Sequence, residues 1–215
     1  MQDLTLDEIR AALADDIAAN AAFDGWTPAA RAMAAEANAI DPDVAALALP
    51  DAMAMIDAWF AHVDTAMKTA LPIDTLTPMK IRARIQQSVE ARLDAMAPHR
   101  EALRRALAIL AMPHHLPAAT RLGWRTVDLI WHRAGDTATD YNHYTKRGIL
   151  LGVYTATVTI FLDDESEGLA DTRAFLARRI DGIMRFEKAK AGFQKRTEHR
   201  PSLSRFIGRL RYPVV

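Results

Sequence analysis

Helix start signals recur along this chain, and they constrain its fold more than any other feature. In Thr27-Pro28, Asp41-Pro42 and Thr77-Pro78, a side-chain oxygen able to cap a helix stands directly before a proline. Proline suits the first helical turn, where its missing amide donor is not needed, and the residue before it supplies the cap. Thr5 and Glu8 have the spacing of a capping box at a further start. The chain is therefore predicted to be a succession of helices.

The composition supports this prediction and excludes several chemistries. Half of the 215 residues are apolar but only 7% are aromatic, and much of the apolar fraction is alanine, the best helix former. The absence of cysteine excludes disulfides, thiolate catalysis and thiolate metal sites. The longest uncharged apolar run, residues 148–162, is shorter than the ~20 residues of a membrane-spanning helix. The N-terminal stretch lacks the basic and apolar regions of a secretory signal, so we expect a cytoplasmic protein.

Helical periodicity predicts an all-α fold of about nine to ten helices. They are expected near residues 5–21, 28–38, 42–48, 51–70, 78–96, 99–112, 117–134, 140–162, 169–191 and 202–211. Only residues 153–161, rich in valine, threonine and isoleucine, have the composition of a strand. No turn signal separates them from the apolar helix before them, so we predict that they continue it as a buried helix.

The first four predicted helices have the layout of a helix-turn-helix unit. A helix ends at the segment Phe23-Asp24-Gly25-Trp26-Thr27, and an alanine-rich helix, a very short helix and a long helix from Asp51 follow. This order resembles the N-terminal part of TetR-type regulators. We therefore expect residues 1–67 to form a TetR-like lobe of a helical bundle.

The charge of this lobe opposes DNA binding. Residues 1–67 hold 12 acidic residues and only two basic ones, Arg10 and Arg31. The short helix in the recognition position, residues 41–48, carries two aspartates and no basic residue. A DNA-binding lobe needs lysine and arginine to displace counterions from phosphates. The helix-turn-helix is therefore predicted to be degenerate, without a nucleic-acid partner. A TetR-type transcriptional regulator is the alternative function.

A second group of motifs lies in the C-terminal half. The segments are LAMPHHLP at 110–117, VDLIWHRAGD at 127–136, TDYNHYTKRGILLGVY at 139–154, residues 163–166 and FLARRIDGIM at 175–184. Over about residues 98–188 the chain resembles the coenzyme Q nine family, accessory proteins of ubiquinone biosynthesis with a TetR-like fold. His143 departs from the family, which often has a large aromatic residue there, and this change bears on a partner or membrane contact.

The resemblance implies a lipid-binding protein that has no catalytic activity and needs no cofactor. Such a protein takes up prenylated quinone intermediates and presents them to the diiron hydroxylase that acts on demethoxyubiquinone. Its implied partners are an isoprenoid quinone or phospholipid, that hydroxylase, and an anionic membrane surface. We also expect a homodimer that lies at the periphery of the inner membrane.

Two groups of site residues are predicted around the helix at 140–162. Partner recognition is assigned to Trp131, Tyr141, Asn142, Tyr144, Lys146 and Arg147. We expect Tyr144 and Arg147 to lie one turn apart on exposed turns near Trp131. Lipid contacts are assigned to Gly148, Leu151, Gly152, Val153 and Phe175. Each glycine costs a helix ~1 kcal/mol, so the pair at 148 and 152 indicates close approach of another helix or of a ligand, and these residues alone favour the helix.

Catalytic alternatives find less support in the sequence. His132, Asp136, Asp140 and His143, with His114 and His115 nearby, have spacings found among metal ligands. However, Gly135 interrupts the helix between them, Asp140 or Thr139 is placed to cap the next helix, and no Glu-x-x-His or His-Glu-x-x-His pattern occurs. None of the four serines lies in a Gly-x-Ser-x-Gly motif, and no glycine-rich phosphate loop is present. We therefore predict no metal site and no catalytic residue.

The C-terminal tail is basic and amphipathic. Residues 170–215 hold 12 basic and four acidic residues. Leu203, Phe206, Ile207 and Leu210 recur at helical spacing, and Arg209 falls elsewhere on the helix. This pattern predicts a helix at an anionic membrane surface, with packing onto the acidic lobe as the alternative. Residues 192–215 are thus a basic linker and amphipathic helix, and residues 68–191 a helical lipid-binding domain.

Overall fold

The structure, a computed structural model, describes residues 4–137 and 141–183, without the side chains of 141 and 142. Within these residues every regular element is helical, which confirms the all-α prediction. The α-helices are α1 (Leu6–Asp24), α2 (Pro28–Ala37), α3 (Pro42–Ala48), α4 (Ala52–Ala70), α5 (Ile73–Leu76), α6 (Ile81–Met96), α7 (Arg100–Leu110), α8 (Leu116–Arg133) and α9 (Tyr141–Asp163). A further helix begins at residue 170 and is described to residue 183.

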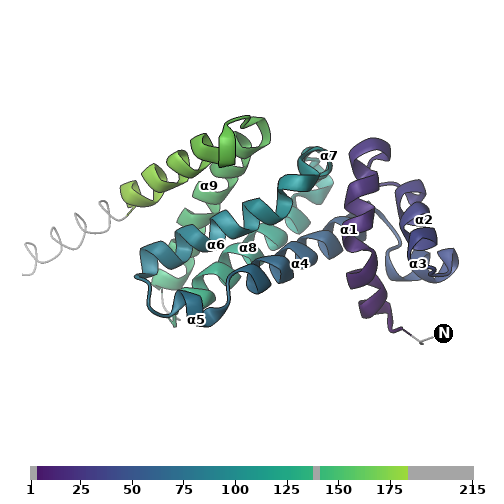
Figure 1. Ribbon diagram of the computed structural model, residues 1–215, viewed down its shortest axis with the longest axis horizontal. Coiled ribbons are helices and arrows are strands. Elements are labelled where there is room, and N and C mark those ends of the chain that lie inside the picture. The colour runs from purple at the N-terminus through teal and green to yellow at the C-terminus, as the bar shows by residue number, and fades with distance from the viewer. Residues whose placement is uncertain (1–3, 138–140, 184–215) are drawn as a thin grey trace, which may run out of the picture. The chain divides into compact units, whose positions relative to one another are not determined.

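Three helices, α1 to α3, pack together at the N-terminal end of the chain and are called the lobe below (Figure 1). The capping box at α1 is confirmed: the Thr5 amide donates to Glu8 Oε2 at 2.8 Å, and the Glu8 amide donates to Thr5 Oγ1 at 3.3 Å. Thr27 and Asp41 cap α2 and α3 as expected. Many of the buried side chains in the lobe are alanines, which lets the three helices pack closely.

Both basic residues of the lobe support its internal structure. Arg10 donates from Nε to the carbonyl oxygen of Ala48 at 2.7 Å, and it pairs with Asp7. Arg31 donates from Nη1 to the carbonyl oxygen of Leu49, also at 2.7 Å. These two side chains therefore satisfy carbonyl groups at the C-terminal end of α3, where a helix leaves acceptors unpaired.

The long helix α4 belongs to both the lobe and the core. It packs on both α1 and α6, and its Trp59 is fully buried. The Trp59 ring lies 5.6 Å from the Trp26 ring of the lobe, and Trp26 Nε1 donates to the carbonyl oxygen of Ala102 in α7 at 2.9 Å. The boundary that we placed after residue 67 falls inside this helix.

The chain between α4 and α6 differs from the prediction. Thr77-Pro78 does not start a helix, because the Thr77 hydroxyl donates to the carbonyl oxygen of Ile73 and Thr77 ends the short helix α5. The next helix, α6, starts only at Ile81. A capping residue followed by proline therefore has two uses, and the sequence around it did not distinguish them.

Helices α6 to α9 complete the core of residues 1–176, which form one compact unit. Residues 153–161 lie within α9, so the prediction that they are helical is confirmed. A second unit, residues 177–215, is described only to residue 183. In the described parts of the chain no single helix has the length and composition to cross a membrane, although α3 and α4 pass that test as a pair bent by 81°.

Candidate functional site

The corner between α8 and α9 is set by a glycine turn. Gly135 has a φ of +88°, a conformation that side-chain-bearing residues rarely adopt. A Cβ at this position would lie 3.0 Å from Arg84 Nη1, which itself donates to the carbonyl oxygen of Ala134 at 2.9 Å. The turn is closed by the Asp136 amide, which donates to the carbonyl oxygen of Trp131 at 3.0 Å.

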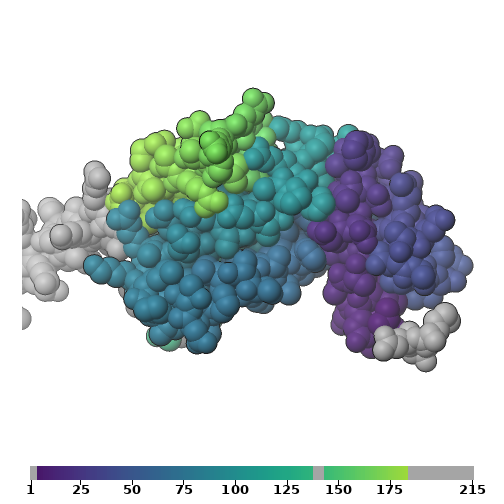
Figure 2. Space-filling model, in the orientation of Figure 1, coloured from purple at the N-terminus to yellow at the C-terminus, as the bar shows by residue number. Residues whose placement is uncertain are grey.

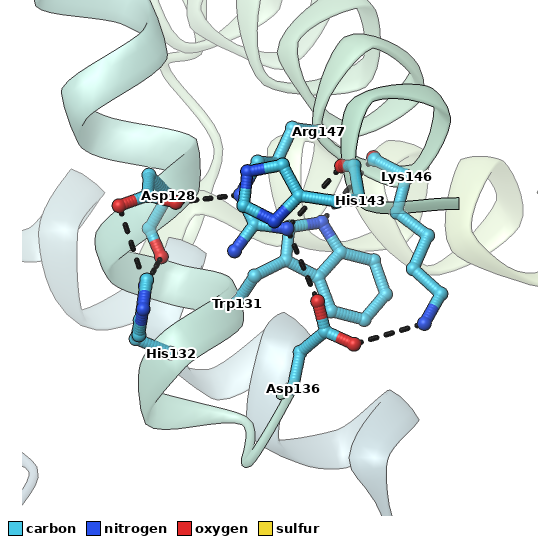
Figure 3. Close-up of polar contacts among 7 residues, drawn as sticks. All are labelled: Asp128, Trp131, His132, Asp136, His143, Lys146 and Arg147. Atoms are coloured by element: carbon cyan, nitrogen blue, oxygen red, sulfur yellow. Dashed lines mark hydrogen bonds and ion pairs between the residues drawn. The ribbon is translucent and has the colours of Figure 1, made fainter. Parts of the chain in front are cut away.

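Two carboxylates from this corner hold two cations of α9 (Figure 3). Arg147 Nε lies 2.6 Å from Asp128 Oδ1, and Arg147 Nη1 lies 3.1 Å from Asp136 Oδ2. Lys146 Nζ lies 2.9 Å from the other oxygen of Asp136. Burial alone would raise the pKa of Asp136, but hydrogen bonds and charges from Lys146 and Arg147 lower it below its usual value.

Arg147 corrects one expectation about this corner. We expected it on an exposed turn, but its side chain is only 1% exposed. It is buried because Asp128 and Asp136 neutralise it and the carbonyl oxygen of His143 accepts a further hydrogen bond at 3.2 Å. The VDLIWHRAGD segment contains Asp128, but the sequence did not predict its ion pair with Arg147. The two residues are 19 positions apart, which is too far for a local pattern to reveal the contact.

The other predicted recognition residues divide into bonded and exposed ones. Trp131 Nε1 donates to the carbonyl oxygen of Lys146 at 3.2 Å, and Lys146 Nζ stands 5.5 Å from the Trp131 ring. Tyr144 is 63% exposed, and its ring centre lies 6.1 Å from that of Trp124. Tyr141 and Asn142 begin α9, but their side chains lie outside the described residues.

His132, one of the histidines considered as a metal ligand, belongs to the same network. His132 Nδ1 lies 3.3 Å from Asp128 Oδ2, on the far side of that carboxylate from Arg147 (Figure 3). Over residues 4–137 and 141–183, no group of three or more histidine, aspartate or glutamate side chains is arranged to hold a metal ion. Thr139 and Asp140, considered as caps or ligands, lie outside the described residues.

Five helices line an apolar cavity of about 280 Å³ that is open to solvent on one side. Its lining residues are Phe60 from α4, Arg92 from α6, Leu103, Leu107, Leu110 and Ala111 at α7, Ala119, Leu122, Gly123 and Thr126 from α8, and Leu151, Tyr154, Thr155, Val158 and Thr159 from α9. Gly123 allows α8 to approach α9 here, because a Cβ would lie 2.8 Å from Leu151 Cδ1.

One wall of the cavity is polar. Arg92 is 1% exposed, forms an ion pair with Asp64, and donates from Nε to the Tyr154 hydroxyl oxygen at 2.9 Å. Burial would lower the pKa of Arg92, but Tyr154 and Asp64 together raise it above its ordinary value, so the guanidinium stays charged. No local sequence pattern predicts this cluster, because Asp64 and Tyr154 lie 28 and 62 residues from Arg92 along the chain.

The residues predicted to contact lipid are placed unequally. Leu151 lines the cavity, whereas Val153 and Phe175 are half-buried and absent from its lining. Gly148 and Gly152 are exposed, and a Cβ at either would meet no atom within 4 Å. The close approach expected of these two glycines belongs instead to Gly123. Leu203, Phe206, Ile207, Arg209 and Leu210 lie outside the described residues.

A larger hollow, of about 580 Å³, lies between α1 and α4, where Figure 2 shows a notch. Four alanines and five polar or charged residues line it, among them Asp7, Arg10 and Asp57. Arg10 and Asp57 are already in ion pairs, with Asp7 and Arg125. Its lining is therefore poorly suited to an apolar ligand, and the smaller cavity is the better candidate site.

The fold and the cavity together define a TetR-like helical protein with an apolar cavity in its core helices. A crystal structure of a TetR transcriptional regulator from Nitrosomonas europaea has the same fold, with a TM-score of 0.66, 24% identity, and coverage of 81% of this chain and 97% of that one. At that identity the likeness shows the fold alone.

Sequence relatives identify the family. The COQ9 family matches residues 116–187. Ubiquinone biosynthesis protein COQ9, mitochondrial, of Bos taurus is 31% identical over 167 residues, 74% of this chain and 52% of that protein. The Rattus norvegicus protein is 32% identical over 74% and 54%, and that of Xenopus tropicalis 40% over 46% and 32%. The chain belongs to the COQ9 family of ubiquinone biosynthesis proteins, and it spans about half the length of the curated relatives it matches.

Proposed function

We propose that this protein is a non-catalytic accessory protein of ubiquinone biosynthesis that binds prenylated quinone intermediates and presents them to a demethoxyubiquinone hydroxylase. The observation that carries the proposal is the cavity between α4, α6, α7, α8 and α9, whose walls are mainly leucine, alanine, valine and phenylalanine side chains. Concave sites of this composition bind apolar molecules. Family membership makes a quinone or its prenylated precursor the ligand to test first.

The size of the cavity limits what it encloses. Sites for drug-sized ligands measure about 300–1,000 Å³, and this one is slightly smaller, at about 280 Å³. It therefore takes one part of a long prenylated molecule, and the rest lies outside. Such partial burial suits a protein that hands its ligand on, because the ligand remains accessible to the next protein.

The direct test is extraction of lipid from the purified full chain, followed by mass spectrometry. We expect a prenylated quinone or precursor in stoichiometric amount. Replacing Leu122 by tryptophan should fill the cavity and remove the lipid, whereas Ile160→Trp, on the exposed side of α9, should not. Lipid-free protein, or equal lipid in both variants, contradicts the proposal.

The contact with the hydroxylase is proposed to centre on Tyr144. This side chain is exposed beside Trp124, while Lys146, Arg147 and Trp131 hold the corner beneath it. Exposed aromatic residues on a rigid support are typical of binding hot spots. Tyr144→Ala should weaken hydroxylase binding about tenfold or more, and change the free energy of unfolding by less than ~1 kcal/mol. Unchanged binding would place the interface elsewhere.

We further propose that the protein acts as a homodimer at the surface of the inner membrane. The basic, amphipathic sequence around Phe206 supports the membrane contact. Phe206→Glu places a charge in its apolar series, and truncation after Glu198 removes it. Both changes should reduce sedimentation with anionic liposomes. Circular dichroism should show that the helical core persists, and intact binding by the truncated chain would overturn this part.

A further inference from the structure

We propose that the cavity receives the oxygen-bearing end of its ligand, and that the Tyr154 hydroxyl, held by Arg92, binds a neutral carbonyl or hydroxyl oxygen there. This inference rests on the proposed function, because it concerns how the same cavity binds its ligand. It goes further by assigning the ligand a direction and a chemical preference.

The geometry gives the cavity one polar end. Arg92 lies in α6 and Tyr154 in α9, and both line the cavity. Arg92 stands 5.7 Å from the Phe60 ring centre and 5.9 Å from that of Tyr154, so aromatic rings confine it. The Arg92 Nε donates to the Tyr154 oxygen, and the ion pair with Asp64 fixes the guanidinium from the other side. This hydroxyl is therefore held in position before any ligand binds.

The hydroxyl hydrogen of Tyr154 is available to donate a hydrogen bond to a ligand oxygen. The Tyr154 oxygen accepts from Arg92, yet among the described residues no acceptor receives its hydrogen. Thr126 and Thr159, also in the lining, donate to the carbonyl oxygens of Leu122 and Thr155 instead. A purely hydrocarbon occupant would leave the tyrosine donor unpaired in apolar surroundings, which is unfavourable. A carbonyl or hydroxyl oxygen would satisfy it.

The charge balance of this wall favours a neutral oxygen over a phosphate. The positive charge of Arg92 is already compensated by the buried carboxylate of Asp64. A second cation, Arg125, lies 3.7 Å from the other Asp64 oxygen and is itself paired with Asp57. A phosphate brought here would therefore add an anion where both cations already have carboxylate partners, at the cost of removing it from water. The site thus discriminates between a quinone or phenol ring and the charged headgroup of a phospholipid.

Exposed apolar side chains mark the connection where the rest of the ligand would leave. Met112 and Leu116 are 44% and 52% exposed. Met112 lies in the connection after α7 and Leu116 begins α8, close in sequence to the lining residues Ala111 and Ala119. A prenyl chain that emerged along this connection would cover apolar surface that water now contacts. The ring would then lie inside and the tail outside.

Fluorescence displacement tests the idea on the full chain. Diphenylhexatriene, a fluorescent hydrocarbon, reports occupancy of the cavity, and three competitors share one decyl tail: a dimethoxy-methyl-benzoquinone, a benzene ring and a phosphate. We expect the quinone to displace the dye at the lowest concentration. In Tyr154→Phe its advantage over decylbenzene should fall about three- to tenfold, the worth of one hydrogen bond, while dye binding is kept. Thr69→Val, which removes a hydroxyl group from an exposed position on α4 outside the cavity, is the matched control.

The outcomes separate this inference from the proposed function. If the dye binds but Tyr154→Phe leaves the quinone advantage unchanged, the ligand direction is wrong and apolar binding stands. A decyl phosphate that competes as well as the quinone overturns the preference for neutral oxygen. Failure of the dye to bind wild-type protein, or dye binding unaffected by Leu122→Trp, overturns the proposed function together with this inference.

Discussion

The N-terminal lobe and the α8–α9 corner use their charges in different ways. In the lobe, Arg10 and Arg31 donate to backbone carbonyl groups, and carboxylates such as Asp41 and Asp51 cap helices at the surface. At the corner, Arg147 is buried against two carboxylates from the neighbouring helix and turn. The two arginines of the lobe thus stabilise its local backbone structure, whereas the ion pairs at the corner connect α9 to α8 and to the turn that follows α8.

The lobe of this chain has few of the cations that a DNA-binding lobe needs, although its fold is shared with a TetR regulator. The TetR regulator from Nitrosomonas europaea shares the arrangement of helices. In this chain the helix-turn-helix keeps its caps and its alanine packing, but residues 1–67 contain only two basic side chains, and both are hydrogen-bonded to backbone. Without further cations the lobe lacks the contacts that phosphate binding needs. The arrangement of α1 to α3 depends on the packing of their buried side chains, and it does not require a basic surface.

The largest expected effect separates the two arginine environments. Arg147→Met should lower the free energy of unfolding by about 3–5 kcal/mol, because Asp128 and the buried Asp136 lose their shared partner. Arg31→Met should cost about 1–2 kcal/mol, because only hydrogen bonds to carbonyl oxygens are lost. Urea unfolding followed by circular dichroism measures both. Equal losses would remove the distinction between lobe and corner.

The helices, and the reasons for them, were accessible from sequence. The caps at Thr5, Thr27, Asp41 and Asp51 act within four residues of the chain, so their signals are local. Residues 153–161 were also predicted correctly as helix, because the absence of a turn signal outweighed their strand-like composition. Thr77-Pro78 was misread, since the same dipeptide can end one helix or begin another.

The site was only partly accessible. The C-terminal motifs located the corner, and Trp131, Lys146 and Arg147 do come together there. The burial of Arg147 was not predictable, because it depends on Asp128 and Asp136 in another helix and turn. The polar wall of the cavity was missed altogether. Asp64, Arg92 and Tyr154 lie on three helices, and periodicity reports which face is apolar but not which buried charges meet.

A second prediction concerns how the stability contributed by Asp136 changes with pH. The pKa of Asp136 is lowered in the folded protein, so its ionised form stabilises the fold above the unfolded value of ~4, and this contribution disappears as pH falls through the folded pKa. Asp136→Asn should therefore be clearly less stable than wild type at pH 6, with the gap shrinking towards pH 3. Thermal unfolding across this range measures the gap.

The lobe supplies the control for the acid experiment. Asp43 is exposed on α3 and has no ion pair within the described part of the chain, so Asp43→Asn should change stability little at any pH in this range. A gap for Asp136→Asn that stays constant from pH 6 to pH 3 would show that the ion pairs with Lys146 and Arg147 do not control the acid response.

The smallest effect comes from the same glycine-to-alanine substitution made at two sites, one exposed on α9 and one where α8 contacts α9. Gly148→Ala adds a methyl group that meets nothing within 4 Å, so the gain in helix propensity should stabilise the protein by about 0.5–1 kcal/mol. Gly123→Ala brings the same gain, but its Cβ would lie 2.8 Å from Leu151 Cδ1. Leu151 must then move where it lines the cavity, which offsets the gain and should weaken diphenylhexatriene binding. Paired denaturation and dye titrations distinguish the sites. If both variants were stabilised equally and bound dye equally, Gly123 would not control the approach of the two helices.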